Sequence, residues 1–401
     1  MFDTSERPVV LIWEVTQACE LACDHCRADA GRGRHPDELT TGEGKRLLDE
    51  AATEFGAGQV VVLSGGDPLK RPDLPELIDY GTDRGLRLSL TPSGTQSLSP
   101  DRVRALADAG LSRMALSFDG GSPEAHDSFR GESGSFADTV RAAEAAREAD
   151  ISLQINTTVC GETVDDLPAI RDLVEDLGAI RWSVFFLVPV GRGATLDPVP
   201  PMQADAVMEW LARVEDDAAF AVKTTEAPQY RRVKQQVEPP ADAARDDGGD
   251  SPSSGGTTGP PPGVTGEDTG GPPPGGADGD SAGPPSGVAT GRPSVLAGDG
   301  FAFVSHTGEM YPSGFLPKSA GTVRESSVAD LYRESPLFTA LRDRGELHGK
   351  CGACEFRTVC GGSRSRAYAA TGDPLAADPL CPYEPDGWDG DGATGDLVAD
   401  D

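Results

Sequence analysis

The 401-residue chain has 35 basic and 66 acidic residues and a formal charge of −31 at pH 7, which argues against binding nucleic acid or an anionic membrane through a basic surface. No apolar run approaches the roughly 20 residues of a membrane span, and the start, MFDTSERP, does not resemble a signal peptide, so we expect a cytoplasmic protein. Only six basic residues are lysines. An acidic, lysine-poor composition suits a halophilic cytoplasm, although GC-rich codon usage would have the same effect.

Short apolar segments alternate with helical patterns over the first half of the chain. Six of them are predicted β-strands, at 9–15, 59–64, 86–91, 113–118, 152–159 and 180–188. Thr40 and Glu43 form a capping box that starts the first helix, and Gly56 ends it. Six strand–helix units predict an α/β fold with a parallel sheet. Because a closed barrel needs eight units, we expect a partial (β/α)6 TIM-like barrel with its chemistry at the carboxyl ends of the strands.

Composition divides the chain into four parts, of which residues 1–236 are the barrel domain. Residues 237–294 are rich in Gly, Pro, Ser and Asp and predict a disordered insertion, with a Pro-rich docking segment as the alternative. Residues 295–385 predict a small C-terminal domain with a β-hairpin, a helix and a second group of cysteines. Residues 386–401 predict an acidic, disordered tail.

Three cysteines follow the first predicted strand with the spacing C-x3-C-x2-C: Cys19, Cys23 and Cys26. In a reducing cytoplasm such a cluster is more typical of metal ligands than of disulfides. A closed zinc or iron–sulfur site takes four protein ligands. Either His25 or His35 supplies the fourth, or one coordination position is open. A [4Fe–4S] cluster on three thiolates would leave one iron free for a small chelating ligand.

Polar residues after the second and fourth strands suit a zwitterionic ligand. Gly65 and Gly66 allow close approach of the backbone, and Asp67 can accept hydrogen bonds from an ammonium group. Ser117 and Arg130 can bind a carboxylate. An ammonium, a carboxylate and an open iron together describe the methionyl part of S-adenosylmethionine (SAM).

The three motifs, C-x3-C-x2-C, GGDP at 65–68 and SxDG…HDxxRG at 117–131, resemble in their order the radical SAM superfamily. The resemblance implies a SAM-binding [4Fe–4S] cluster on the three cysteines; a structural zinc site is the alternative. It also implies contacts to SAM from His25, Gly65, Gly66, Asp67, Pro68, Ser93, Ser117, Arg130 and Asn156.

Within this resemblance, His25 occupies the position that packs beside the adenine, and 65–68 meets the amino group of SAM. Asp67 stands where Glu is commoner, but its shorter carboxylate still accepts hydrogen bonds. Ser93, Asn156 and the turn at 188–193 would line the ribose and adenine. A hydrogen bond within the barrel rim is the alternative role for Asn156.

A second cysteine group near the C-terminus resembles the SPASM extension of radical SAM enzymes, which usually carries two auxiliary [4Fe–4S] clusters. Ser313 and Ser363 stand where that family has cysteines, and there is no Cys between 160 and 351. The resemblance therefore implies that residues 295–385 form a small C-terminal iron–sulfur domain with one auxiliary cluster; zinc bound by the same four cysteines is the alternative. Cys160 is predicted to be an inert buried thiol. The ligands implied are Cys351, Cys354, Cys360 and Cys381.

Within the superfamily, WEVTQACELACDHCRADA, QINTTV and CGGSRSRAYAATGDPLAADPLC resemble the tetrapyrrole branch of haem and haem d1 biosynthesis, as a sister group. This implies an oxidoreductase that reductively cleaves SAM and abstracts hydrogen from a tetrapyrrole side chain, with oxidative decarboxylation or side-chain loss. A maturase of a ribosomally made peptide and a non-catalytic iron–sulfur or zinc protein are the alternatives. Only eight residues precede the first strand, which favours a small-molecule substrate over a peptide. A ferredoxin or flavodoxin is the expected electron donor.

Overall fold

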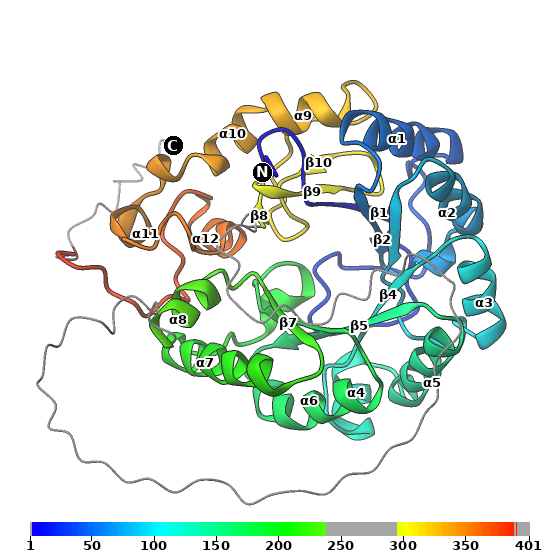
Figure 1. Ribbon diagram of the computed structural model, residues 1–401, viewed down its shortest axis with the longest axis horizontal. Helices are drawn as coiled ribbons and strands as arrows, with labels where there is room; N and C mark the ends of the chain where they lie inside the picture. The colour runs from blue at the N-terminus through cyan, green and yellow to red at the C-terminus, as the bar shows by residue number, and fades with distance from the viewer. Residues whose placement is uncertain (1, 238–294, 389, 391–401) are drawn as a thin grey trace, which may run out of the picture.

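The computed structural model describes residues 2–237, 295–388 and 390 of the chain (Figure 1). The predicted disordered insertion lies outside these residues except for residue 237, and the predicted acidic tail lies outside them beyond residue 390. Seven parallel strands form the barrel sheet: β1 (Val10–Thr16), β2 (Val60–Gly65), β3 (Arg87–Leu90), β4 (Arg113–Ser117), β5 (Ser152–Val159), β6 (Arg181–Phe186) and β7 (Ala221–Thr225).

Strands from the C-terminal part of the chain extend the same sheet beside β1. Strand β9 (Gly300–Val304) pairs with β1 in parallel, β10 (Met310–Tyr311) pairs antiparallel with β9, and β8 (Leu296–Ala297) also pairs with β9. The order β10-β9-β1-β2-β3-β4-β5-β6-β7 curves into an open half-barrel (Figure 1). The predicted α/β class and partial TIM-like barrel are confirmed, with one more barrel strand, β7, than the sequence predicted.

Helices surround the outer side of the curved sheet (Figure 1). Those of the barrel are α1 (Thr41–Glu54), α2 (Leu74–Asp83), α3 (Pro100–Asp108), α4 (Pro123–Arg130), α5 (Ser135–Glu148), α6 (Leu167–Asp176), α7 (Pro201–Asp217) and α8 (Gln229–Val237). Those of the C-terminal part are α9 (Val328–Glu334), α10 (Pro336–Arg342), α11 (Gly349–Ala353) and α12 (Arg364–Thr371). The predicted capping box is present at α1, where Thr40 and Glu43 bond each other's backbone N–H.

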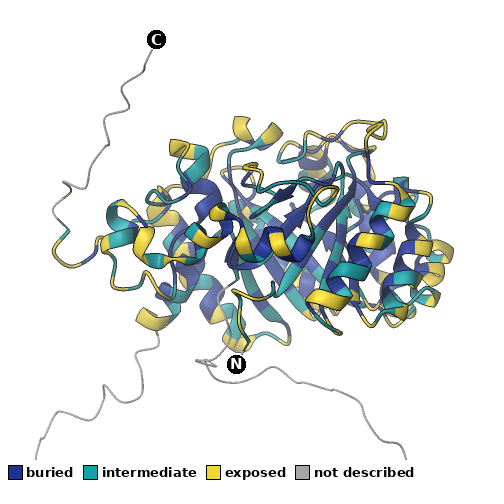
Figure 2. Cartoon of the chain, turned by 90° about the horizontal axis from the view of Figure 1, so that it is seen from above, coloured by how far each residue is buried: buried dark blue, intermediate teal, exposed yellow. Residues whose placement is uncertain are grey.

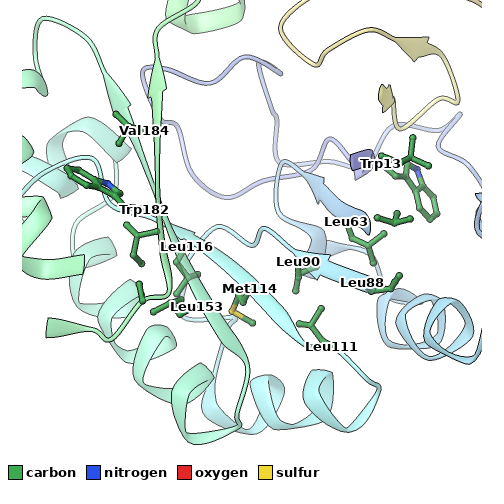
Figure 3. Packing of buried hydrophobic residues seen from close by; sticks show 14 of the residues in the cluster. Trp13, Leu63, Leu88, Leu90, Leu111, Met114, Leu116, Leu153, Trp182 and Val184 are labelled. Atoms are coloured by element: carbon green, nitrogen blue, oxygen red, sulfur yellow. The ribbon is translucent and has the colours of Figure 1, made fainter. Parts of the chain in front are cut away.

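The main core fills the space between the strands and the outer helices. Figure 3 shows its strand side chains, which include Trp13, Leu63, Met114 and Trp182. Trp182 of β6 lies 6.0 Å from Trp210 of α7, with the two rings perpendicular. Figure 2 shows the result: the strands are buried, and exposed residues lie mainly on the outer helices and loops. Within the described residues, no helix is both long and apolar enough to cross a bilayer.

Candidate active site

The loop after β1 holds Cys19, Cys23 and Cys26 near one another at the carboxyl end of the sheet. Cys19 and Cys23 are buried and Cys26 is partly buried, and the three pack together in a small apolar cluster. The backbone of the loop is held from the other side of the barrel: Arg192 donates from Nε to the Cys23 carbonyl at 2.9 Å and from its backbone N–H to the Cys26 carbonyl at 3.0 Å. These hydrogen bonds fix the position of the loop.

The three thiols are soft donors of the kind that both iron–sulfur clusters and zinc take. Thiolates around one zinc lie about 2.3 Å from the metal, whereas those of a four-iron cluster surround a larger body. Burial raises the pKa of the Cys23 thiol above its ordinary value. A bound cation would favour the thiolate form of Cys23.

The glycines of the GGDP motif are required by the backbone of the cysteine loop. A Cβ on Gly65 would lie 2.1 Å from the Thr16 carbonyl oxygen, and one on Gly66 would lie 2.5 Å from that of Ala18. The N–H of Gly66 donates to Thr16 at 2.9 Å. These glycines therefore let the chain after β2 pack directly on the chain after β1, which adds to the predicted role in ligand approach.

Asp67 is fully buried, and its carboxylate caps the short 3-10 helix Pro68–Lys70 by accepting from the Leu69 N–H at 3.2 Å. Burial raises the pKa of this carboxyl. Ser93 lies between the two motifs, because its hydroxyl is 3.3 Å from the Cys19 sulfur and donates to the Gly66 carbonyl at 2.9 Å. Of the predicted SAM contacts, Ser93 and the GGDP motif are thus brought beside the cysteines.

His25 and Arg130 form one polar group with Asp119 beside the cysteine loop. The His25 ring stacks on Phe129 at 5.0 Å between centroids, and Arg130 Nη1 donates to Asp119 Oδ2 at 3.3 Å. His25 Nε2 lies 3.9 Å from the same carboxylate oxygen. Burial would raise the pKa of Asp119, but the charges of His25 and Arg130 outweigh it and hold that pKa below its ordinary value. Burial lowers the pKa of His25.

Two buried atoms of this group have no hydrogen-bond partner among the described residues: Nε of Arg130 and Nδ1 of His25. Buried polar atoms are normally paired, so unpaired ones beside a cysteine loop indicate a polar ligand. Ser117 and Arg130 are both predicted to bind the carboxylate of a ligand, and within the protein Nη1 of Arg130 is paired with Asp119. Sequence reasoning did not single out Asp119, although it is the third residue of the SxDG motif.

Ser117, the last residue of β4, and Asn156, in the middle of β5, lie side by side because they are paired in register. The side-chain oxygen of Asn156 accepts from the Gln154 amide at 2.8 Å. This is a hydrogen bond within the barrel, the alternative role considered for Asn156. Both residues remain partly exposed at the same edge of the sheet as the cysteine loop.

The four C-terminal cysteines line one pocket beside the start of α8, just after β7: Cys351, Cys354, Cys360 and Cys381. Backbone N–H groups already point at two of the sulfurs, from Gly362 to Cys360 and from Asp378 to Cys351, each at 3.4 Å. Burial raises the pKa of Cys360 to about 12 and that of Cys381 to about 11. A metal would favour the ionised form of these two thiols, and four cysteines in one pocket supply the number of ligands that a fully ligated metal site takes.

Ser313 and Ser363, which stand at cysteine positions of the SPASM family, both donate hydrogen bonds to the carboxylate of Glu226. Ser313 donates to it at 3.1 Å, Ser365 donates at 2.9 Å, and Ser363 also donates. Glu226 directly follows β7 and has a left-handed backbone with φ of +56°. Sequence reasoning did not identify Glu226.

Cys160 is fully buried, and burial raises its pKa to about 11, as expected of an unreactive thiol.

Comparisons with known proteins agree with this geometry. The sequence profile of the radical SAM superfamily matches residues 13–174. The chain is 37% identical over 385 residues to the AdoMet-dependent heme synthase of Methanosarcina barkeri, covering 96% of this chain and 99% of that protein. The chain therefore belongs to the radical SAM superfamily, and it is a radical SAM enzyme.

Two further relatives and one solved structure are also similar to this chain. The Fe-coproporphyrin III synthase of M. barkeri is 30% identical, over 95% of this chain and 89% of that protein. The PqqA peptide cyclase of Rhodopseudomonas palustris is 29% identical, over 94% and 88% of the two chains. In fold, the chain is similar to Streptococcus suis SuiB bound to S-adenosylmethionine, with a TM-score of 0.65 at 14% identity, over 94% of this chain and 78% of that one.

Proposed function

We propose that this radical SAM enzyme removes hydrogen from a side chain of a tetrapyrrole and thereby promotes its oxidative decarboxylation or loss. The observation that carries the proposal is the similarity over nearly the whole chain to a protein named AdoMet-dependent heme synthase. We place the enzyme in the cytoplasm, and its acidic, lysine-poor composition supports a salt-rich one. A ferredoxin or flavodoxin is the proposed electron donor.

Cys19, Cys23 and Cys26 would hold a [4Fe–4S] cluster in the loop after β1. Three observations support this: the three thiols pack together, they are buried or partly buried, and Arg192 donates a hydrogen bond to the backbone of the loop. When bound there, the cluster and SAM would supply the 5′-deoxyadenosyl radical that takes a hydrogen atom from the substrate. The protein itself positions these groups and excludes water.

The residues around the cysteine loop would orient SAM. Arg130 would direct its unpaired Nε at the carboxylate, and Asp119 would keep the guanidinium in place. His25, stacked on Phe129, would lie beside the adenine. The remaining contacts would come from Gly65, Gly66, Asp67, Pro68, Ser93, Ser117 and Asn156. These residues meet at one edge of the sheet, which is what the binding of one ligand requires.

The four C-terminal cysteines would hold a second [4Fe–4S] cluster. Because all its coordination positions would be filled by protein, this site suits electron transfer or structure rather than substrate binding. Arg232 and Lys350 line the same pocket and would offset the negative charge of four thiolates. Ser313 and Ser363 bind Glu226 where a further cluster would otherwise need thiolates.

A peptide substrate is the second candidate, and the relative named PqqA peptide cyclase favours it. That relative is less similar to this chain than the heme synthase is, at 29% against 37% identity. The two substrates can be separated by experiment. After anaerobic reconstitution with iron and sulfide, the enzyme is incubated with SAM, dithionite and iron-coproporphyrin III, and the products are read by mass spectrometry.

The tetrapyrrole proposal expects a product that has lost CO2 and two hydrogen atoms from a propionate side chain. One hydrogen atom would go to the 5′-deoxyadenosyl radical, and the other would leave as a proton while one electron passes to an acceptor, for which the proposed second cluster is the candidate. Each such loss should accompany the formation of 5′-deoxyadenosine. An enzyme that cleaves SAM but leaves iron-coproporphyrin III unchanged would contradict this substrate. If it then modified a precursor peptide, the second candidate would replace the first.

A further inference from the structure

Lys223 lies in the middle of β7, paired in register with Ser183 of β6. The adjacent residues Val222 and Trp182 are buried in the core between the sheet and the outer helices. Because successive side chains of a strand point to opposite faces, Lys223 and Ser183 face the interior of the half-barrel. The hydroxyls of Ser183 and Thr225 lie 3.3 Å apart on this same face.

Lys223 has neither a hydrogen bond nor an ion pair for its side chain within the described residues. Three of the six lysines, Lys45, Lys70 and Lys234, pair with carboxylates, and Lys350 donates to a carbonyl. Lys318 is exposed to solvent, but Lys223 is partly buried inside the barrel. An ammonium group without a partner in such a place costs free energy, and a bound anion would offset this cost.

The surroundings of Lys223 are cationic. Burial, followed by the charges of Arg181 and Arg231, lowers its pKa to about 8, and no carboxylate contributes to the shift. Arg231 belongs to α8 and also lies close enough to Cys360 for the two charges to interact. Arg231 also interacts with Asp299, so Lys223 is the positive group of this set that has no partner within the described residues and is best able to attract an anion.

An aromatic wall, made of Phe185, Phe303 and Phe315, connects this cationic group to the cysteine loop. Phe185 lies on the same face of β6 as Ser183, and its ring is 6.5 Å from that of Phe315. The guanidinium of Arg27, the residue after Cys26, lies 6.0 Å from the centre of the Phe315 ring and 4.5 Å from that of Phe303. Phe185 and Phe315 are partly exposed and offer an apolar surface, whereas Phe303 is buried.

We propose that Lys223 binds a carboxylate of the substrate inside the half-barrel, while the aromatic wall contacts the flat body of the same molecule. The inference rests on the proposed function, because a coproporphyrin combines a flat apolar ring with carboxylate arms. Pockets of this kind are largely apolar, and a few charged groups fix the orientation of the ligand. Lys223 would hold one arm and so decide which part of the ring faces the cysteine loop.

The test is an anaerobic optical titration of the reconstituted protein with iron-coproporphyrin III and, in parallel, with its tetramethyl ester. The wild type should bind the tetra-acid more tightly than the ester. Lys223→Gln should weaken binding of the tetra-acid about tenfold or more and leave the ester nearly unchanged, since a charge-assisted contact is lost. Lys223→Arg should keep most of the affinity. Lys318→Gln removes the same charge from the surface and should bind like the wild type.

Thermal unfolding of the same proteins separates binding from structure. Because Lys223 has no partner to lose, Lys223→Gln should melt at the same temperature as the wild type or higher. Equal affinity of wild type and Lys223→Gln for the tetra-acid would overturn the inference about Lys223 and leave the proposed function standing. A lower melting temperature of the variant would do the same. A wild type that binds neither porphyrin would overturn the proposed tetrapyrrole substrate, and the inference with it.

Discussion

At the scale of single residues, His126 shows how the loop after β4 depends on protonation. The ring is fully buried, its Nδ1 accepts from the Asp119 N–H at 3.2 Å, and its Nε2 lies 3.3 Å from the Ser135 hydroxyl. Both contacts suit the neutral ring. Burial, with the charge of Arg130, lowers the pKa of His126 from 6.5 to about 4. The folded state therefore binds fewer protons than the unfolded state between these values.

It follows that the contribution of neutral His126 to stability is complete above about pH 6.5 and is lost as the pH falls toward about 4, on the order of 3 kcal/mol in all. We predict that His126→Gln, which can still donate and accept, shows a flatter fall of the unfolding free energy between pH 7 and pH 5 than the wild type. Denaturant titrations at each pH measure this. Parallel curves for the two proteins would contradict the assignment of a buried neutral imidazole.

At the scale of elements, Glu226 joins three segments that are far apart in the sequence. Its carboxylate accepts from Ser313 after β10 and from Ser363 and Ser365 at the start of α12, and its carbonyl accepts from Arg366 at 2.7 Å. Glu226 also has a left-handed φ of +56°, which costs a residue with a Cβ about 1 kcal/mol or more. The gain from its hydrogen bonds must exceed this strain.

Two substitutions of Glu226 separate the contribution of its hydrogen bonds to stability from the cost of its strained backbone. Glu226→Ala should lower the unfolding free energy by about 2 kcal/mol or more, because three hydroxyls lose a charged acceptor. Glu226→Gly loses the same bonds but relieves the backbone, so it should be about 1 kcal/mol more stable than the alanine variant. Denaturant unfolding compares them. If the glycine variant were the less stable of the two, the backbone strain would not be real.

Elements also differ in how far the sequence could predict them. Six strands were found because each is an apolar run, and the cysteine motifs because their ligands are close in the chain. Strand β7, AVKTT, was missed because it is short and carries Lys223. The pairing of β9 with β1 joins residues about 290 apart, which local patterns do not encode. Glu226 was missed for the same reason, since its partners come from distant segments.

At the scale of the whole molecule, the two cysteine groups lie at the carboxyl ends of β1 and β7, on opposite parts of the open sheet. Seven cysteines can hold two four-iron clusters, so we predict about eight irons per reconstituted chain. Changing Cys351, Cys354 and Cys360 together to Ala should leave about four. Iron and zinc analysis measures this. About twelve irons in the wild type, or stoichiometric zinc, would contradict the proposed ligands.

The central claim is that the cysteines after β1 hold the cluster that cleaves SAM. Its most direct test is the yield of 5′-deoxyadenosine from SAM and dithionite, measured by chromatography for wild type, Cys23→Ser and Cys160→Ser. A serine is a poor ligand for iron, so Cys23→Ser should form none, whereas Cys160→Ser, which changes a buried thiol outside both groups, should match the wild type. Formation of 5′-deoxyadenosine by Cys23→Ser at the wild-type rate would contradict the account.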